Sequence, residues 1–160
     1  MAGKHGATWL DSYIDIHEKN LLQLEKRGYV VENDLVLEPV GDDYWIRGFV
    51  RCRDGIWVKV NKELVTVETR SGRKKVQTRT YNYHAHHDLL GPLFRYDSSH
   101  GDHKDYHHKD IYSPLTDVPK NHIELDWENV PHLSEVIDEA VEWYDANRAE
   151  IEIKLTRMLD

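Results

Sequence analysis

The chain has 160 residues, of which 39% are hydrophobic and 31% are charged, and its formal net charge is -8. This length suits one domain, and the composition excludes a disordered polymer and a membrane protein, since no apolar run approaches the roughly 20 residues that span a bilayer. The acidic balance argues against broad, nonspecific binding of nucleic acid. The lone cysteine, Cys52, cannot form an internal disulfide, and the first residues lack the apolar stretch of a secretory signal, so we expect a cytoplasmic protein.

The first half of the chain predicts a helix followed by antiparallel strands. Between residues 8 and about 26, apolar residues recur at steps of three and four, which indicates an amphipathic helix that Gly28 can end. Alternation over residues 44–52 indicates a strand, and Asp54-Gly55 after it is the strongest two-residue signal for a hairpin. Further strand signals lie at 35–40, 56–60, 65–67 and 76–83, with a second turn at Ser71-Gly72.

The second half predicts one more strand, a polar loop and a helix. Residues 93–96 have strand character, residues 97–119 are expected to form the loop, and residues 131–158 keep a helical step. The predicted fold class is therefore α+β, a single domain over residues 1–160. An antiparallel β-sheet meander of four to six strands is flanked by an N-terminal and a long C-terminal α-helix. The expected core residues are Leu10, Ile14, Leu21, Ile46, Val58, Val67, Val136, Ile137 and Val141.

Histidines are concentrated in one part of the chain. Seven of the 11 histidines lie within 25 residues, where uniform scatter would place fewer than two. Burying several charged imidazoles would require partners, so this excess indicates a functional region. The seven are His84, His86, His87, His100, His103, His107 and His108.

Two kinds of chemistry fit a cluster of this composition. Metal binding needs imidazoles and carboxylates that converge, but no spacing here matches a strong zinc signature, and one cysteine excludes a thiolate site. Acid–base catalysis needs a group that titrates near neutrality, as histidine does. A reaction at phosphate also needs a permanent cation, and Arg95 between Phe94 and Tyr96 suits that role, although a salt bridge to Asp97 explains it equally well.

Several short motifs follow one another between residues 44 and 144: Tyr81-x-Tyr83-His84, Phe94-Arg95-Tyr96-Asp97, His100 and His107-His108-Lys109. Their order resembles the TumE family, which comprises small toxin components of bacterial and archaeal toxin–antitoxin pairs. The chain differs at Ser98, where the family pattern has asparagine, and at Asp110, where it has histidine.

The resemblance implies the toxin of a type II toxin–antitoxin system, neutralised by a cognate antitoxin that is a helix-turn-helix DNA-binding protein. RNA cleavage is the expected activity by analogy with other small toxins, and it needs no cofactor. The hypothesis is a metal-independent ribonuclease in which two histidines, with His84 and His108 preferred, act as base and acid. The catalytic candidates are His84, Arg95, Asp97, His107 and His108, and the candidate RNA contacts are Tyr83, Tyr96, Lys74, Lys75 and Lys109.

Two alternatives stay open at this point. The first is a metal-dependent nuclease or metal-binding protein that holds a divalent ion. The second is a non-enzymatic regulatory protein whose histidine loop binds a partner. The sequence also leaves open whether copies of the chain form a homo-oligomer. The candidate metal ligands are His84, Asp97, His103, His107 and His108.

The same residues give a geometric prediction. A connection of eleven residues separates Tyr83 from Arg95, short enough for their strands to pair as a hairpin. We therefore expect the catalytic candidates of residues 95–108 to meet His84 in one pocket at a strand end. Basic residues also gather around Lys74 and Lys75, and we expect this hairpin to offer a second surface for RNA or for the antitoxin.

Overall fold

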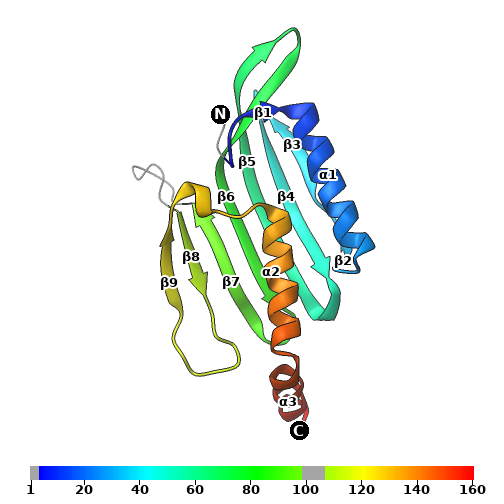
Figure 1. Cartoon of the computed structure of the whole chain (residues 1–160), viewed down its shortest axis with the longest axis vertical. Coiled ribbons are helices and arrows are strands. Elements are labelled where there is room, and N and C mark those ends of the chain that lie inside the picture. Colours follow the sequence, from blue (N-terminus) through cyan, green and yellow to red (C-terminus); the bar gives the residue numbers. More distant parts are fainter. Residues whose placement is uncertain (1–3, 99–106) are drawn as a thin grey trace.

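The computed structural model of the chain describes residues 4–98 and 107–160. Within these residues, nine strands form one antiparallel sheet with the spatial order β2-β4-β5-β6-β7-β8-β9, while β1 pairs with β6 and β3 with β4 (Figure 1). The elements are β1 Thr8–Trp9, α1 Leu10–Lys26, β2 Val30–Asn33, β3 Val36–Val40, β4 Asp43–Cys52, β5 Ile56–Arg70, β6 Arg73–His87, β7 Gly91–Ser98, β8 His107–Ile111, β9 Asn121–Leu125, α2 Leu133–Ala146 and α3 Arg148–Leu159, with short 3-10 turns at Arg53–Gly55 and Trp127–Asn129.

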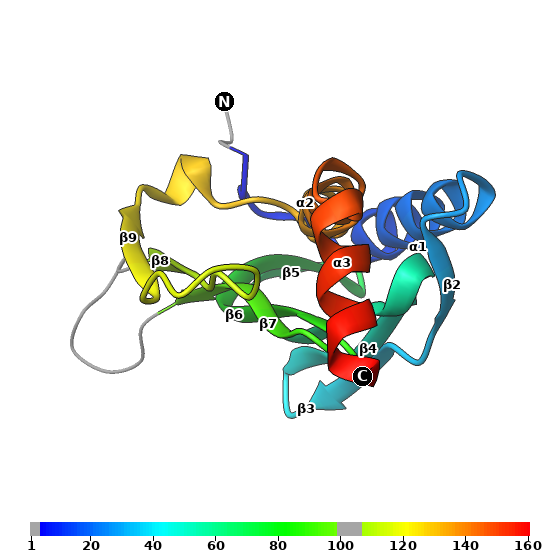
Figure 2. The same ribbon diagram turned by 90° about the horizontal axis from the view of Figure 1, so that it is seen from below.

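Helices α1 and α2 cover the same face of the sheet (Figure 2). Successive side chains of a strand point to opposite faces, so each strand presents an apolar row to the helices. Val58 and Val60 of β5 and Ala85 of β6 are 0–1% exposed on this helix-covered face. The opposite face, which we call the open face, carries the intervening side chains of the same strands.

The two predicted hairpin turns are present. Asp54 and Gly55 join β4 to β5 with φ angles of 60° and 76°, and Ser71 and Gly72 join β5 to β6 with φ angles of 51° and 77°. Two consecutive residues with positive φ match the twist of antiparallel strands, which is why such pairs make tight hairpins. The prediction of an antiparallel α+β meander between helices is confirmed.

Three details of the prediction are wrong. The sheet has more than six strands, partly because β8 and β9 lie in and after residues 97–119, which were expected to form a loop. Val67 is 49% exposed, because β5 is one long strand whose register with β6 shifts between Thr66 and Glu68, beyond the helices. The C-terminal helix is broken at Asn147, whose side-chain amide donates to the Trp143 carbonyl at 2.8 Å.

Most of the expected core is confirmed. Six of the named residues are buried, and Leu10 and Ile14 are partly buried at the start of α1. The six buried residues are Leu21, Ile46, Val58, Val136, Ile137 and Val141.

None of the helices in the described part of the chain is long and apolar enough to cross a membrane.

Candidate functional site

Four side chains form a row across the open face. His84 on β6 is paired in register with Arg95 on β7, Arg95 with Asp110 on β8, and Asp110 with His122 on β9. Directly opposite residues of antiparallel strands have Cβ atoms about 4.5–5.5 Å apart, so neighbouring members of this row can touch. The hairpin of β6 and β7 is the one that the short connection predicts.

Asp110 is the buried centre of the row. Its side chain is 2% exposed and accepts from Arg95 Nη2 at 2.9 Å and from His122 Nδ1 at 2.8 Å, while Lys120 Nζ lies 3.9 Å away. Burial raises the pKa of this carboxyl, but the hydrogen bond from His122 and the charges of Lys120 and Arg95 outweigh burial and lower the pKa below its ordinary value. Asp110 is therefore an anion that holds Arg95 and His122 in place by hydrogen bonds and lies near the Lys120 ammonium.

A second row lies beside the first. Asp97 on β7 is in register with His108 on β8. Asp97 Oδ2 is 3.8 Å from Arg95 Nε and 3.9 Å from His108 Nε2, and the same His108 nitrogen is 3.9 Å from Asp110 Oδ2. Arg95 and His108 therefore share two carboxylates. Burial lowers the pKa of His108, and the two carboxylates oppose that effect only in part.

His84 is an uncharged imidazole beside Arg95. Its Nε2 is buried and has no hydrogen-bond partner among the described residues. Burial, followed by the neighbouring His86, Arg95 and Lys59, lowers the pKa of His84 to about 4. The ring is therefore neutral at pH 7 and offers a free nitrogen lone pair beside the Arg95 guanidinium.

Aromatic rings continue the site toward β4. The His84 and His86 ring centroids are 3.9 Å apart, and His86 stacks on Trp57 of β5 with centroids 4.1 Å apart and an interplanar angle of 5°. Phe49 of β4 contacts Trp57 edge-on at 5.6 Å and is 44% exposed. The open face thus places a patch of flat apolar surface next to a cluster of charged and titratable groups.

A cation accompanies the rings. Lys59 on β5 is in register with His84, is exposed, and has no ion pair among the described residues. Arg51 on β4 lies on the same face and pairs with Asp88 at 3.3 Å. An extended anion that crosses the open face would therefore meet positive charge at both Lys59 and Arg95.

His107 is not part of this site. Although it precedes His108, strand alternation points it at the helix-covered face, where it is 6% exposed and stacks on Trp127 at 4.5 Å. Its Nδ1 is hydrogen-bonded to the Tyr81 hydroxyl at 2.9 Å. The expectation that His107 and His84 share one pocket is wrong, because adjacent strand residues face opposite sides.

Three of the predicted RNA contacts are on the helix-covered face for the same reason. Tyr83 and Tyr96 are 2% and 7% exposed. The Tyr96 hydroxyl donates to Glu139 of α2, and Lys109 Nζ lies 2.8 Å from a Glu139 oxygen. Tyr96 and Lys109 therefore hold α2 on the sheet, and none of the three side chains lines the surface that carries Arg95.

The basic hairpin is separate from the cluster. Lys74 and Lys75 lie ten or so residues before His84 on β6, a separation of about 30 Å along an extended strand. Lys75 Nζ is 5.6 Å from the Trp9 ring centroid and 3.9 Å from a Glu68 oxygen. RNA that contacts this hairpin would therefore bind at a second surface, away from the cluster around Arg95.

The residues able to hold a metal differ from those predicted. One ligand atom from each of His108, Asp110 and His122 lies within 4.8 Å of the others, a set of two imidazoles and a carboxylate. The predicted ligands His84 and Asp97 are outside this group. His107 faces away, and His100 and His103 lie outside the described residues. Asp110 already carries the Arg95 ion pair, which competes with a metal for the same carboxylate.

Neither Asp110 nor His122 was predicted from the sequence to be a site residue. Residues 121–125, Asn-His-Ile-Glu-Leu, alternate in polarity as a strand does, and that signal could have placed His122 on a sheet face. No family model, no curated protein and no solved structure matches the chain. The site is therefore interpreted from its own geometry.

Proposed function

We propose that the protein is a ribonuclease that cleaves single-stranded RNA on the open face of its sheet. The observation that carries this proposal is the row of His84, Arg95, Asp110 and His122 across β6, β7, β8 and β9. A neutral imidazole beside a fixed guanidinium, with further imidazoles on the next strands, is what transfer at a phosphodiester requires.

The geometry supports a two-histidine reaction. His84 Nε2 takes the proton of a ribose 2′-hydroxyl, and the 2′-oxygen attacks the adjacent phosphorus. Arg95 pairs with the phosphate oxygens as charge develops on them. The bond from phosphorus to the 5′-oxygen breaks, and His108 in its protonated form gives that oxygen a proton, which leaves a 2′,3′-cyclic phosphate, a 5′-hydroxyl and a neutral His108. Asp97, which lies between Arg95 and His108, positions both.

The aromatic patch indicates single-stranded RNA as the substrate. Unpaired bases stack on exposed aromatic rings, whereas a duplex keeps its bases stacked on one another. Phe49 is 44% exposed, and Trp57 beside it is partly exposed, next to the catalytic row. A base that stacks on these rings would direct the following phosphate toward Lys59, two residues after Trp57 on β5, and toward Arg95 on β7 of the same face.

The biological role that we propose is that of a cytoplasmic toxin in a toxin–antitoxin pair. Its support is the order of the motifs shared with the TumE family, and the site adds a reason why free activity would harm a cell. An antitoxin that neutralises the protein would cover the open face, because RNA reaches Arg95 only from that face. Expression of the chain should therefore stop growth, and Arg95→Met should relieve that effect.

The decisive experiment is cleavage of defined RNAs by the purified protein. We expect short single-stranded RNAs to yield 2′,3′-cyclic phosphate ends, and both His84→Gln and Arg95→Met to lower the rate by about 100-fold or more. Arg27→Met is the matched control, since Arg27 is also an exposed arginine in an ion pair, with Asp138, but lies at the end of α1. Intact RNA, or equal rates for the three variants, would refute the proposal and favour a non-enzymatic binding function.

A metal-dependent nuclease is the second candidate, and the convergence of His108, Asp110 and His122 favours it. Two imidazoles and a carboxylate suit a divalent transition metal, which could activate water for attack on phosphorus. Chelation separates the candidates: cleavage that survives EDTA supports the two-histidine reaction, while loss of cleavage that added Mn²⁺ or Zn²⁺ restores supports the metal. The products differ as well, because attack by water leaves no cyclic phosphate.

A further inference from the structure

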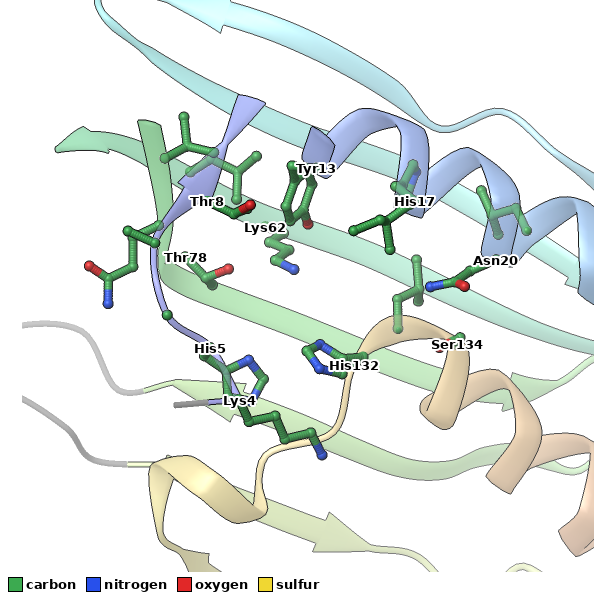
Figure 3. A pocket seen from close by; sticks show the side chains of 18 residues that line it. Lys4, His5, Thr8, Tyr13, His17, Asn20, Lys62, Thr78, His132 and Ser134 are labelled. Carbon is green, nitrogen blue, oxygen red and sulfur yellow. The ribbon is translucent and has the colours of Figure 1, made fainter. Parts of the chain in front are cut away.

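A cavity of about 460 Å³ lies on the helix-covered side of the sheet, away from the open face. Its walls come from α1, the first turn of α2, strands β5 and β6, and the segment before β1 (Figure 3). This volume is in the range of sites that bind small molecules. None of the residues proposed for RNA cleavage lines it, so it is independent of that function.

Lys62 of β5 projects its ammonium into this cavity (Figure 3). Lys62 is 7% exposed and makes no ion pair with a carboxylate among the described residues. Its ammonium lies 5.0 Å from the Tyr13 ring centroid. Burial opposes the charge, but the hydroxyls of Tyr83 and Tyr13 outweigh it and raise the pKa of Lys62, so the group is a cation at pH 7.

A buried cation without a counter-charge is costly. Removing an ammonium from water carries a penalty of several kcal/mol, and the tyrosine hydroxyls beside Lys62 are hydrogen-bond partners but not carboxylates. Proteins usually place a carboxylate beside such a group. Here the side chain borders an open volume instead, and an anion bound in that volume would supply the missing charge.

The other titratable groups around the cavity add no negative charge at its centre. Burial, with a contribution from Lys62, lowers the pKa of His5, His17 and His132, so their rings are neutral at pH 7. The carboxylate of Glu135 is close, but it accepts from the His132 backbone at 3.0 Å and from Lys4 at 2.9 Å. Neutral imidazoles can donate hydrogen bonds to an anion without repelling it.

The start of α2 strengthens the positive potential. Leu133 and Ser134 begin this helix of 14 residues and line the cavity, so the unpaired N–H groups of its first turn lie at the wall. Leu21, Leu64 and Val76 also line the cavity and supply an apolar surface. The cavity therefore has a polar, cationic part and an apolar part.

We propose that this cavity binds a small organic anion, with its carboxylate or phosphate group at Lys62 and an apolar or aromatic body against Leu21, Leu64 and Val76. A ligand of this kind would close the space between α1 and α2 and stabilise their packing on the sheet. Its occupancy would then act on the fold from the face opposite the proposed RNA site.

The test uses phenyl phosphate and benzoate as probes, with benzyl alcohol as the uncharged analogue. Titration followed by calorimetry and by amide chemical shifts should show saturable binding of one or both anions with Kd on the order of 1 mM or tighter, and none of the alcohol. The shifts should centre on the amides of Lys62, His132 and Ser134. Lys62→Met, which keeps the length of the side chain and removes its charge, should weaken binding roughly 10- to 100-fold.

Two controls keep the outcome unambiguous. Lys26→Met removes an exposed lysine of α1 that does not line the cavity, and it should bind the probes as the unaltered chain does. Arg95→Met removes the phosphate-binding arginine that we propose on the open face, and it should leave the probe-dependent shifts at Lys62, His132 and Ser134 unchanged. Lys62→Met must show the same amide dispersion as the unaltered chain. Absence of saturable binding, or equal affinity for Lys62→Met and the unaltered chain, would overturn the proposal and would leave the ribonuclease proposal unaffected.

Discussion

Arg95 and Asp110 form an ion pair across β7 and β8, with Nη2 and Oδ2 2.9 Å apart, and the Asp110 side chain is buried while the Arg95 side chain is 31% exposed. The buried partner fixes the position of the arginine, and the exposed part of the guanidinium stays available to a ligand. This division suits a residue that must bind phosphate without moving.

The pair also gives a prediction about stability. Asp110→Asn should lower the free energy of unfolding by about 1–2 kcal/mol, because Arg95 and Lys120 lose their shared counter-charge while part of the guanidinium remains hydrated. Urea unfolding monitored by circular dichroism measures the change. Asp11→Asn, which removes the carboxylate of the exposed pair with Arg73, is the control and should leave the unfolding midpoint unchanged. Equal effects of the two substitutions would contradict the central role of Asp110.

His84 should titrate far below an ordinary histidine. Its pKa is lowered to about 4 in the folded protein, against about 6.5 for an unperturbed imidazole. The unfolded chain therefore takes up this proton first, and the contribution of His84 to stability is present above pH 6.5 and is lost as the pH falls toward 4. Proton NMR of the His84 ring measures the midpoint directly. A midpoint near 6.5 would contradict the lowering of the His84 pKa by burial and by its positive neighbours.

His107 and His108 should respond in opposite ways to substitution. His107→Ala should cost about 1–3 kcal/mol of stability, because it removes a buried ring and its hydrogen bond to Tyr81. His108→Ala should leave stability nearly unchanged and lower RNA cleavage strongly, because His108 faces the open side near Asp97. Thermal unfolding and cleavage rates of the two variants provide the comparison. Loss of cleavage by a fully folded His107→Ala protein would contradict the assignment of faces.

The sequence was sufficient for much of the fold because its signals are local. Alternation and positive-φ turn residues define the hairpins at Asp54-Gly55 and Ser71-Gly72 without reference to the rest of the chain. The strand β8 was missed because its residues are almost all polar, so burial of Asp110 is invisible until Arg95, Lys120 and His122 arrive from other segments. The site forms only when β8 pairs with β7 and β9, and the positions of the histidines in the sequence do not reveal that pairing.

The aromatic patch gives the last prediction. Trp57→Ala should weaken binding of single-stranded RNA by about 1–3 kcal/mol, or roughly 5- to 150-fold, since each base stacked on an aromatic ring contributes about that much. Binding of a catalytically inactive Arg95→Lys protein to fluorescent RNA, with and without the Trp57 change, isolates stacking from cleavage. Trp143→Ala is the matched control, because Trp143 lies on α2 beside Glu139 and Glu142, where acidic charge repels RNA. The effect should persist at high salt, since stacking, unlike phosphate contacts, releases no counterions. An effect that disappears as salt is raised would instead mean that Trp57 acts by positioning Lys59, and the base-stacking role would have to be abandoned.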